Sequence, residues 1–204
     1  MADLTATVSL VLKQFCVCGG GVLLIRRILW AGFLAAVVNV AAVAGSSTPE
    51  TFVEAMGWYR AQAENGHAQA QFLYGYMHET GQGVARDEVT ARHWYAKASA
   101  QGDAGAQYRL ARLYQDGRGG GIDPVRAARW YRAAAEQDHR DAQSMLGYLH
   151  AMGHGVARDD VQAYFWFTLA AAASDEQAAI NRDRLITLLT PEQIAAGDVL
   201  VEAW

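Results

Sequence analysis

The sequence contains few cysteines and few prolines, and it has no excess of positive charge. Only Cys16 and Cys18 occur among the 204 residues, so the chain after Cys18 cannot supply a disulfide, a thiolate metal site or a cysteine nucleophile. Only three prolines are present, which favours helices because proline interrupts them. There are 17 Lys and Arg residues against 21 Asp and Glu, a net charge of −4 without the basic field that phosphate binding needs. We therefore expect no nucleic-acid partner.

Residues 1–44 resemble a leader segment. Arg26 and Arg27 precede an uncharged, largely apolar run at residues 28–43, and this run leads into Ala42-Val43-Ala44. A positive region, an apolar core and an Ala-x-Ala end are the three parts of a secretory signal peptide, so we expect export to the periplasm and cleavage near Ala44. A start of translation near Val22 would give this signal its usual short positive region. The alternative is an uncleaved inner-membrane anchor, because residues 23–43 could nearly span a bilayer if Arg26 and Arg27 were tolerated there.

The rest of the chain repeats with a period of 36 residues. Alanine-glutamine pairs, Gly-x-Gly turns and a single Asp recur in phase, and no insertion interrupts them. The units are residues 67–102, 103–138 and 139–174, preceded by a half repeat within 45–66 and followed by capping helices within 175–204. Four of the six tryptophans keep the period, each followed by another aromatic residue: Trp58, Trp94, Trp130 and Trp166. Such a period predicts an all-α solenoid of helix-turn-helix repeats.

Each unit predicts two helices, here called helix A and helix B. In the first unit helix A spans residues 67–79 and ends at the turn glycines, since glycine adopts the left-handed conformation that closes helices. Asp87 then caps helix B, which ends near Gly102. Each Trp is expected to fill the gap between its own helix A and the next unit. The expected core face of helix A consists of Ala70, Leu73, Tyr74 and Met77.

The C-terminal segment predicts a seal for the solenoid. Residues 175–189 have the length of a fourth helix A. Thr190, Pro191 and Gln193 form a capping-box pattern that starts a last helix. The side chains expected to cover the final repeat from this helix are Ile194, Val199, Leu200 and Trp204.

These motifs resemble the Sel-1-like repeat, a relative of the tetratricopeptide repeat. The shared pattern is Ala-Gln-x-x-x-Gly, then Gly-x-Gly-Val, then Asp-x-x-x-Ala-x-x-Trp-Tyr-x-x-Ala, over about residues 50–174. The resemblance implies an α/α superhelix whose concave face, lined by the A helices, binds another protein or a peptide. Penicillin-binding or β-lactamase activity has been attributed to a subgroup with one cysteine pair in each repeat. This chain lacks those cysteines.

No residue pattern points to catalysis or to a metal. The glycine-rich stretch at residues 117–121 lacks the preceding strand and the Lys-Ser/Thr that a phosphate loop needs. His150 and His154 are four residues apart, but Gly153 separates them, and His78 occupies the same repeat position as His150, which favours packing. An Asp that recurs before each helix B is a helix cap. We therefore expect no catalytic residue, no metal and no cofactor.

The candidate binding residues lie on the face of helix A opposite the expected core. This face carries Glu79 in the first unit, Gln115 in the second and Ala151 in the third, together with aromatic residues and Arg. Aromatic residues and Arg often anchor interfaces, although single exposed aromatic residues are also common. The candidates are Phe72, Tyr76, Tyr108, Arg112 and Tyr148.

The sequence as a whole predicts a non-catalytic protein-interaction scaffold or adaptor in the cell envelope. The alternative is an enzyme of the same repeat family that acts on peptidoglycan or β-lactams. Such an enzyme needs a cluster of polar residues that does not follow the repeat, and the sequence shows none.

Overall fold

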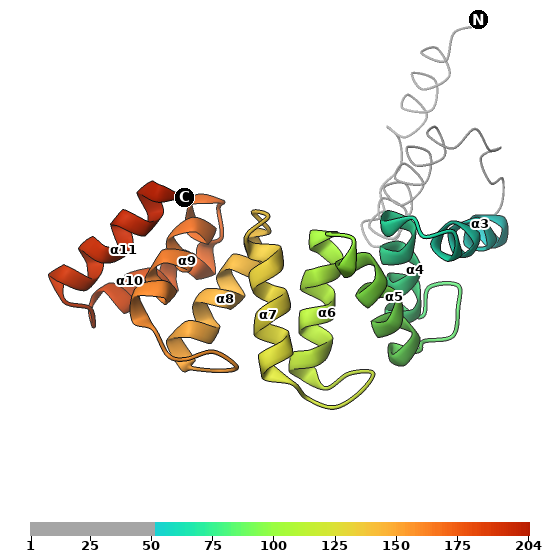
Figure 1. Cartoon of the computed structure of the whole chain (residues 1–204), viewed down its shortest axis with the longest axis horizontal. Helices are drawn as coiled ribbons and strands as arrows, with labels where there is room; N and C mark the ends of the chain where they lie inside the picture. The colour runs from blue at the N-terminus through green and yellow to red at the C-terminus, as the bar shows by residue number, and fades with distance from the viewer. Residues whose placement is uncertain (1–51) are drawn as a thin grey trace, which may run out of the picture. The chain divides into compact units, whose positions relative to one another are not determined.

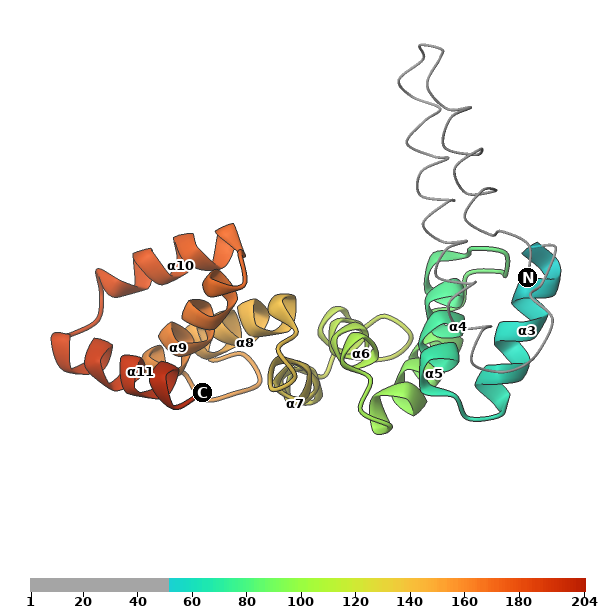
Figure 2. The same cartoon turned by 90° about the horizontal axis from the view of Figure 1, so that it is seen from above.

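The computed structural model of the protein describes residues 52–204, and no strand occurs in this part of the chain. From α3 to α10 each helix packs against the next one, so the helices form a row, and α11 returns to pack on α9 (Figures 1 and 2). The expectation of an all-α solenoid is confirmed. The helices are α3 (Phe52–Glu64), α4 (Ala68–Thr80), α5 (Glu88–Ala100), α6 (Ala104–Asp116), α7 (Pro124–Ala135), α8 (Arg140–Met152), α9 (Asp160–Ala172), α10 (Glu176–Ile186) and α11 (Pro191–Ala203).

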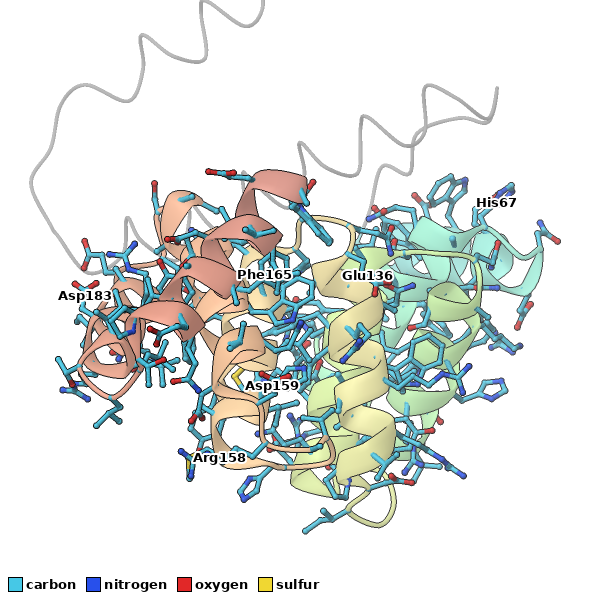
Figure 3. The ribbon with its side chains drawn as sticks, turned by 60° about the vertical axis from the view of Figure 1, so that its left-hand side comes forward. His67, Glu136, Arg158, Asp159, Phe165 and Asp183 are labelled. Atoms are coloured by element: carbon cyan, nitrogen blue, oxygen red, sulfur yellow. The ribbon has the colours of Figure 1, made fainter. Side chains whose placement is uncertain are left out.

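The predicted helix caps are confirmed. The Asp87 carboxylate accepts hydrogen bonds from the backbone N–H groups of the first turn of α5. Asp123 does the same for α7, and Asp159 does so for α9, where it lies beside Arg158 (Figure 3). Thr190 closes the expected capping box at the start of α11. Helix A of the first unit begins one residue later than predicted, because residue 67 is its N-cap.

The two glycines of each Gly-x-Gly turn have different roles. The first one ends helix A in the left-handed conformation, with φ between 70° and 74°. The second one touches the preceding unit: a Cβ on Gly119 would lie 2.3 Å from the Glu88 carbonyl oxygen. On Gly155 a Cβ would lie 2.0 Å from the Pro124 carbonyl oxygen. In these two turns the second glycine therefore allows contact with the start of the previous helix B, backbone against backbone.

In every repeat the aromatic residue that follows the Trp is buried between the helices, whereas the burial of the Trp itself varies. Trp94 and Trp166 are buried, but Trp58 and Trp130 are partly exposed. Trp130 nevertheless packs against the core clusters on both of its sides, as expected of a Trp that fills the gap between units. Adjacent helical positions point about 100° apart, so a Trp and its neighbour cannot both face one junction. The neighbours have exposed fractions of at most 3%, and they are Tyr59, Tyr95, Tyr131 and Phe167.

The core face of α4 is turned slightly from the predicted one. Ala70 and Met77 are buried as expected, whereas Leu73 and Tyr74 stay partly exposed. In the structure this face also includes Gly75. A Cβ added to Gly75 would lie only 3.0 Å from the Tyr95 ring. The aromatic ring can approach the helix backbone at this point because no side chain intervenes.

A buried glutamine links each helix A to the helix B before it. Its polar side chain is tolerated in the core because the amide donates a hydrogen bond to a backbone carbonyl near the end of that helix. The bonds measure 3.1 to 3.3 Å and join Gln71 to Ala63, Gln107 to Ser99, and Gln143 to Ala135. The recurring Ala-Gln motif thus has a structural explanation.

The C-terminal seal is made by α10 and α11, both of which pack on α9. Leu200 contacts the core of the third repeat, and the Trp204 ring lies 5.4 Å from the Trp166 ring and 5.7 Å from the Phe165 ring. Val199 is exposed, so the expectation that it packs on the repeat is wrong. It neighbours Leu200 on the helix and therefore points away from α9.

The predicted leader, its cleavage site and the anchor alternative all fall within residues 1–51, outside the residues that the structure describes. Within residues 52–204 no helix is long and apolar enough to cross a membrane. Export and anchoring therefore stay predictions.

Candidate protein-binding surface

The A helices α4, α6, α8 and α10 present corresponding positions in register, because the repeat contains no insertions. The five candidate residues fall into two such rows. We call the first the Phe72 row, and it consists of Phe72, Tyr108, Ser144 and Ile180. We call the second the Tyr76 row, and it consists of Tyr76, Arg112, Tyr148 and Arg184.

The Phe72 row contributes in part to packing between units. The Phe72 ring lies 5.9 Å from the Tyr95 ring and reaches the second residue of α6, Gly105. Tyr108 lies 5.8 Å from the Tyr131 ring and stacks at 4.7 Å on His139, the N-cap of α8. Phe72 and Tyr108 are therefore half-buried, because each packs against the next helix A. Only part of each ring is exposed for contact with a partner.

The Tyr76 row is more available. Arg112 and Arg184 make no ion pair with any residue in 52–204. Tyr148 is 41% exposed, with its ring 6.5 Å from that of His154. Tyr76 is partly covered, because the Arg109 guanidinium lies 5.0 Å above its ring. The row thus alternates an aromatic ring with a guanidinium from one unit to the next.

Glu79 does not belong to the exposed face where the sequence placed it, because it is buried. Tyr95 donates a hydrogen bond of 2.7 Å to its carboxylate. Arg118 donates one of 3.0 Å, and Arg109 lies at 3.5 Å. A carboxylate satisfied by three donors can be buried in this way. We call the pair of positions occupied by Glu79 and Tyr95 the rung of a repeat.

The rung changes along the solenoid. In the second repeat Tyr131 donates a hydrogen bond of 2.6 Å to Gln115, a neutral acceptor. In the third repeat the same positions hold Ala151 and Phe167, which form no such bond. Burial raises the pKa of the Tyr95 hydroxyl, and the negative charge of the Glu79 carboxylate raises it further. Burial also raises the pKa of the Tyr131 hydroxyl. Both hydroxyls therefore stay protonated donors.

A groove of about 420 Å³ opens at the third rung, between α8 and α10. Phe167 of α9 is buried in its floor beside Leu185. A polar hollow at the start of α8 and α10 has the same volume of about 420 Å³, so the lining and not the size distinguishes this groove. The groove is lined by Tyr148, Ala151, Phe167, Gln177, Asn181, Arg184, Leu185 and Leu188.

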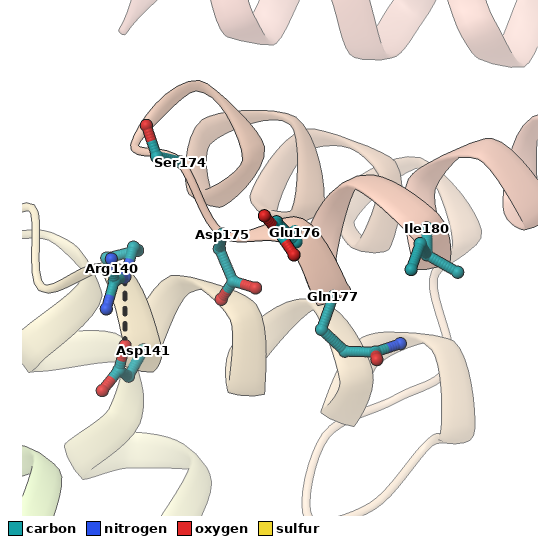
Figure 4. Close-up of a pocket in the computed structure, with 7 residues that line it drawn as sticks. All are labelled: Arg140, Asp141, Ser174, Asp175, Glu176, Gln177 and Ile180. Atoms are coloured by element: carbon teal, nitrogen blue, oxygen red, sulfur yellow. Dashed lines mark hydrogen bonds and ion pairs between the residues drawn. The ribbon is translucent and has the colours of Figure 1, made fainter.

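A second hollow at the start of α8 and α10 is polar (Figure 4). Arg140 pairs there with Asp141 at 3.2 Å, and Asp175 accepts the backbone N–H of Ala178 at 2.9 Å as the cap of α10. Glu176 adds a further carboxylate. The polar groups of this hollow are largely helix caps and pairs among themselves, which gives them a structural role.

The two histidines that the sequence placed four residues apart lie in different environments. His150 is buried, with Nε2 3.3 Å from an Arg132 guanidinium nitrogen, while His154 is exposed in the turn. Burial, and then the charge of Arg132, lower the pKa of His150. Among residues 52–204 no three side chains of the metal-binding kinds converge.

Sequence reasoning missed Arg118, Arg184 and Leu188. Arg184 had a detectable signal, because it lies 36 residues after Tyr148 and thus continues the candidate row into the capping helix. Arg118 had no comparable signal, since its partner Glu79 lies 39 residues earlier in the preceding unit. The five candidates themselves stay predictions as binding residues.

Stacked helical hairpins with aromatic and Arg side chains in register define a repeat-solenoid scaffold. More particularly, the chain belongs to the Sel1 repeat family, whose family model matches residues 68–103, 104–139 and 140–175. Proteins of this family are generally non-catalytic helical scaffolds that mediate protein–protein interaction.

Solved structures with the same fold come from several bacteria. A Sel1 repeat protein from Oxalobacter formigenes is 35% identical over 64% of this chain and 54% of its own, with a TM-score of 0.62. A protective antigen of uropathogenic Escherichia coli with an SLR fold is 26% identical over 80% of this chain and 42% of its own, with a TM-score of 0.55. The chain thus spans about half the length of these two relatives.

A third structure, cysteine-rich protein B of Helicobacter pylori, shows the fold alone. It is 18% identical over 64% of this chain and 96% of its own, with a TM-score of 0.52. No curated protein matches the chain.

Proposed function

We propose that this protein is a non-catalytic adaptor that binds a protein or peptide segment along the A helices, with the Tyr76 row as the main line of contact. The observation that carries the proposal is the alternation of aromatic ring and guanidinium at one position of four successive helices. These side chains include two arginines without an ion pair in residues 52–204 and a tyrosine that is 41% exposed. Aromatic residues and Arg are the types most enriched among residues that dominate binding energy.

Charge supports the proposal. The whole chain carries a net charge of −4, but the Tyr76 row contributes only positive charge. A row of cations on an acidic protein attracts a partner segment with carboxylates and favours one register over others. Several acidic side chains of residues 52–204, by contrast, are engaged as helix caps or in the Glu79 network.

Photocrosslinking in cells tests the proposal. A photoreactive residue at Tyr148 or Tyr76 is expected to trap the same discrete protein, because both positions belong to one row. The matched control is Val125, an exposed residue on helix B of the second unit, where we expect no such product. A screen for turnover of peptidoglycan and a β-lactam runs in parallel. Turnover without any crosslink at either row position would favour the enzyme alternative instead.

We further propose that the adaptor works in the cell envelope, after export and cleavage near Ala44. The support is the Arg26–Arg27 pair followed by an apolar run and a small-x-small end. Cell fractionation with N-terminal sequencing of the mature protein tests this. A mature N-terminus after Ala44 in the periplasmic fraction is the expected result. An intact N-terminal segment in the membrane fraction would instead favour the anchored form.

A further inference from the structure

The rung of the third repeat differs from the other two by a paired replacement. Glu79 with Tyr95, and Gln115 with Tyr131, are hydrogen-bonded pairs of 2.7 and 2.6 Å. In the third repeat both members change together, to Ala151 and Phe167. The replacement removes an acceptor and its donor at the same time, so no buried polar group is left without a partner.

The consequence is space with an apolar lining. The short Ala151 side chain leaves the volume that Glu79 and Gln115 fill in the earlier units, and the groove of about 420 Å³ lies there. Phe167 and Leu185 form a buried floor, while Tyr148 and Leu188 stand at the rim. The rim residues are 41% and 77% exposed.

The surroundings of the groove are unusually apolar for a surface. Met152 and Ile180 are also exposed large hydrophobic residues, and they lie on α8 and α10, the helices that form the groove. Ile180 lines the polar hollow, so the exposed apolar residues grouped at the groove itself are Tyr148 and Leu188, and exposed apolar residues that stand together mark interaction sites. The first and second A helices, α4 and α6, have no comparably exposed large hydrophobic residue.

The polar groups of the groove indicate the chemistry of its occupant. Arg184 lines one end and makes no ion pair within residues 52–204. Gln177 and Asn181 line the wall, joined to each other by a hydrogen bond of 3.1 Å, and their remaining amide groups match a peptide backbone. The other end of α10 carries Asp175 and Glu176 in the polar hollow (Figure 4). This charge gradient directs an acidic residue of the occupant toward Arg184.

We infer that this groove is a specificity pocket that takes one large apolar side chain of an extended protein segment, with an Asp or Glu of that segment on Arg184. The inference rests on the proposed function, since it names the segment that the adaptor prefers. The pocket belongs to the third repeat because only this rung is apolar and open.

Selection from a random heptapeptide library on the purified full chain tests the pocket. We expect enrichment of peptides with a large apolar residue adjacent to Asp or Glu. The affinity of an enriched peptide is then measured by fluorescence anisotropy, together with versions in which the apolar residue is Ser or the acidic residue is Lys. Each change is expected to weaken binding by about tenfold, which corresponds to 1.4 kcal/mol.

The chain offers its own matched variants. The double substitution Ala151→Gln with Phe167→Tyr copies the second rung, whose acceptor is neutral and needs no arginine, into the third repeat, so we expect it to fold and to fill the groove. Binding of the enriched peptide is expected to fall by at least about tenfold. Arg184→Glu is expected to reverse the preference from acidic to basic peptides. Arg129→Glu, an exposed change on α7, is expected to leave binding unchanged.

Two results would overturn the inference. The first is unchanged peptide binding in the variant with the copied rung. The second is self-association of the full chain, in analytical ultracentrifugation, that this variant abolishes, because the occupant would then be a second copy. In either case a persistent crosslink of one partner at Tyr76 and Tyr148 would leave the proposed adaptor function standing. Loss of both crosslinks would remove the proposed function as well.

Discussion

The first and third repeats share their helices, caps and turns, yet their rungs are filled in opposite ways. In the first repeat Glu79 gathers Tyr95, Arg109 and Arg118 into a buried charged network that ties two units together. In the third repeat an alanine and Phe167 leave a groove instead. The difference shows that the rung is not required for the solenoid backbone. One unit uses it for cohesion between units, and another leaves it open on the surface.

The Gly-x-Gly turn contributes to the same contrast. Its middle residue is Arg118 after α6 and His154 after α8, at equivalent positions. Arg118 reaches back to Glu79 and Glu88 of the preceding unit, with distances of 3.0 and 2.9 Å. His154 instead lies at the edge of the Tyr148 ring beside the groove. This turn residue therefore links two units by ion pairs in the second repeat, whereas in the third repeat it makes a ring contact within its own unit.

The largest expected effect comes from removing the buried charge of the first rung. Glu79→Leu leaves Tyr95 without its acceptor and deprives Arg109 and Arg118 of a carboxylate, although both arginines keep some access to water. We expect a loss of about 2–3 kcal/mol in the free energy of unfolding, measured with urea. Gln115→Leu, the same change at the neutral second rung, is expected to cost only about 1 kcal/mol. Equal losses would show that the charge adds no cohesion.

The third repeat is expected to depend on its aromatic seal instead. Trp204→Ala removes two ring contacts, to Phe165 and Trp166, and each such pair contributes about 0.5–1.5 kcal/mol. We therefore expect a loss of about 1–2 kcal/mol in urea unfolding, with a change in the fluorescence of Trp166. A variant as stable as the wild type would mean that α11 seals the repeat through Leu200 and Ile194 alone.

Removing the rung hydroxyl in the first repeat and adding one in the third are opposite substitutions, and we expect a smaller loss of stability from each. Tyr95→Phe removes the donor to a buried carboxylate and is expected to cost about 1–1.5 kcal/mol. Phe167→Tyr places a hydroxyl next to an open groove, where water can satisfy it, so we expect less than about 0.5 kcal/mol. Thermal unfolding of both variants measures the difference. Comparable destabilisation by the two changes would contradict the view that the third rung is open.

The smallest effect concerns pH. Because burial and Arg132 lower the pKa of His150, the folded protein keeps this imidazole neutral at a pH where the unfolded chain, with a pKa near 6.5, binds a proton. The stability from this residue is thus fully present above about pH 6.5 and falls below it. His150→Tyr, which copies Tyr114 of the second repeat, is expected to make the midpoint of urea unfolding depend less on pH between about pH 7 and 5. His139, whose pKa burial also lowers, retains part of the slope. An unchanged slope would mean that the folded protein admits the charged imidazole.

Much of the fold follows from the sequence because its determinants are local. Asp87, Asp123 and Asp159 act as caps within a turn of their own positions, and the first turn glycine ends its own helix. The period then fixes the order of the hairpins. Periodicity also identified the Tyr76 row, although it stopped one helix short of Arg184.

The sequence could not place Glu79, because its burial depends on donors from other helices. A charged residue on the polar side of a helical pattern predicts exposure, and only Arg109 and Arg118 of the next unit change this outcome. The groove escaped prediction for a similar reason. Ala151 looks unremarkable alone, and its meaning appears only with Phe167 behind it and Leu188 across from it.

The contact at Gly119 and Gly155 has a practical consequence for engineering. Because each unit meets its predecessor through main-chain atoms at this point, the joint does not depend on which side chains the neighbours carry. We expect that a whole 36-residue module can be duplicated or deleted in the interior while the joint is preserved. An array lengthened by a copy of the third module would carry a second Ala151–Phe167 rung, but a copy of α8 would face that rung in place of α10, so the two copies would present differently lined surfaces.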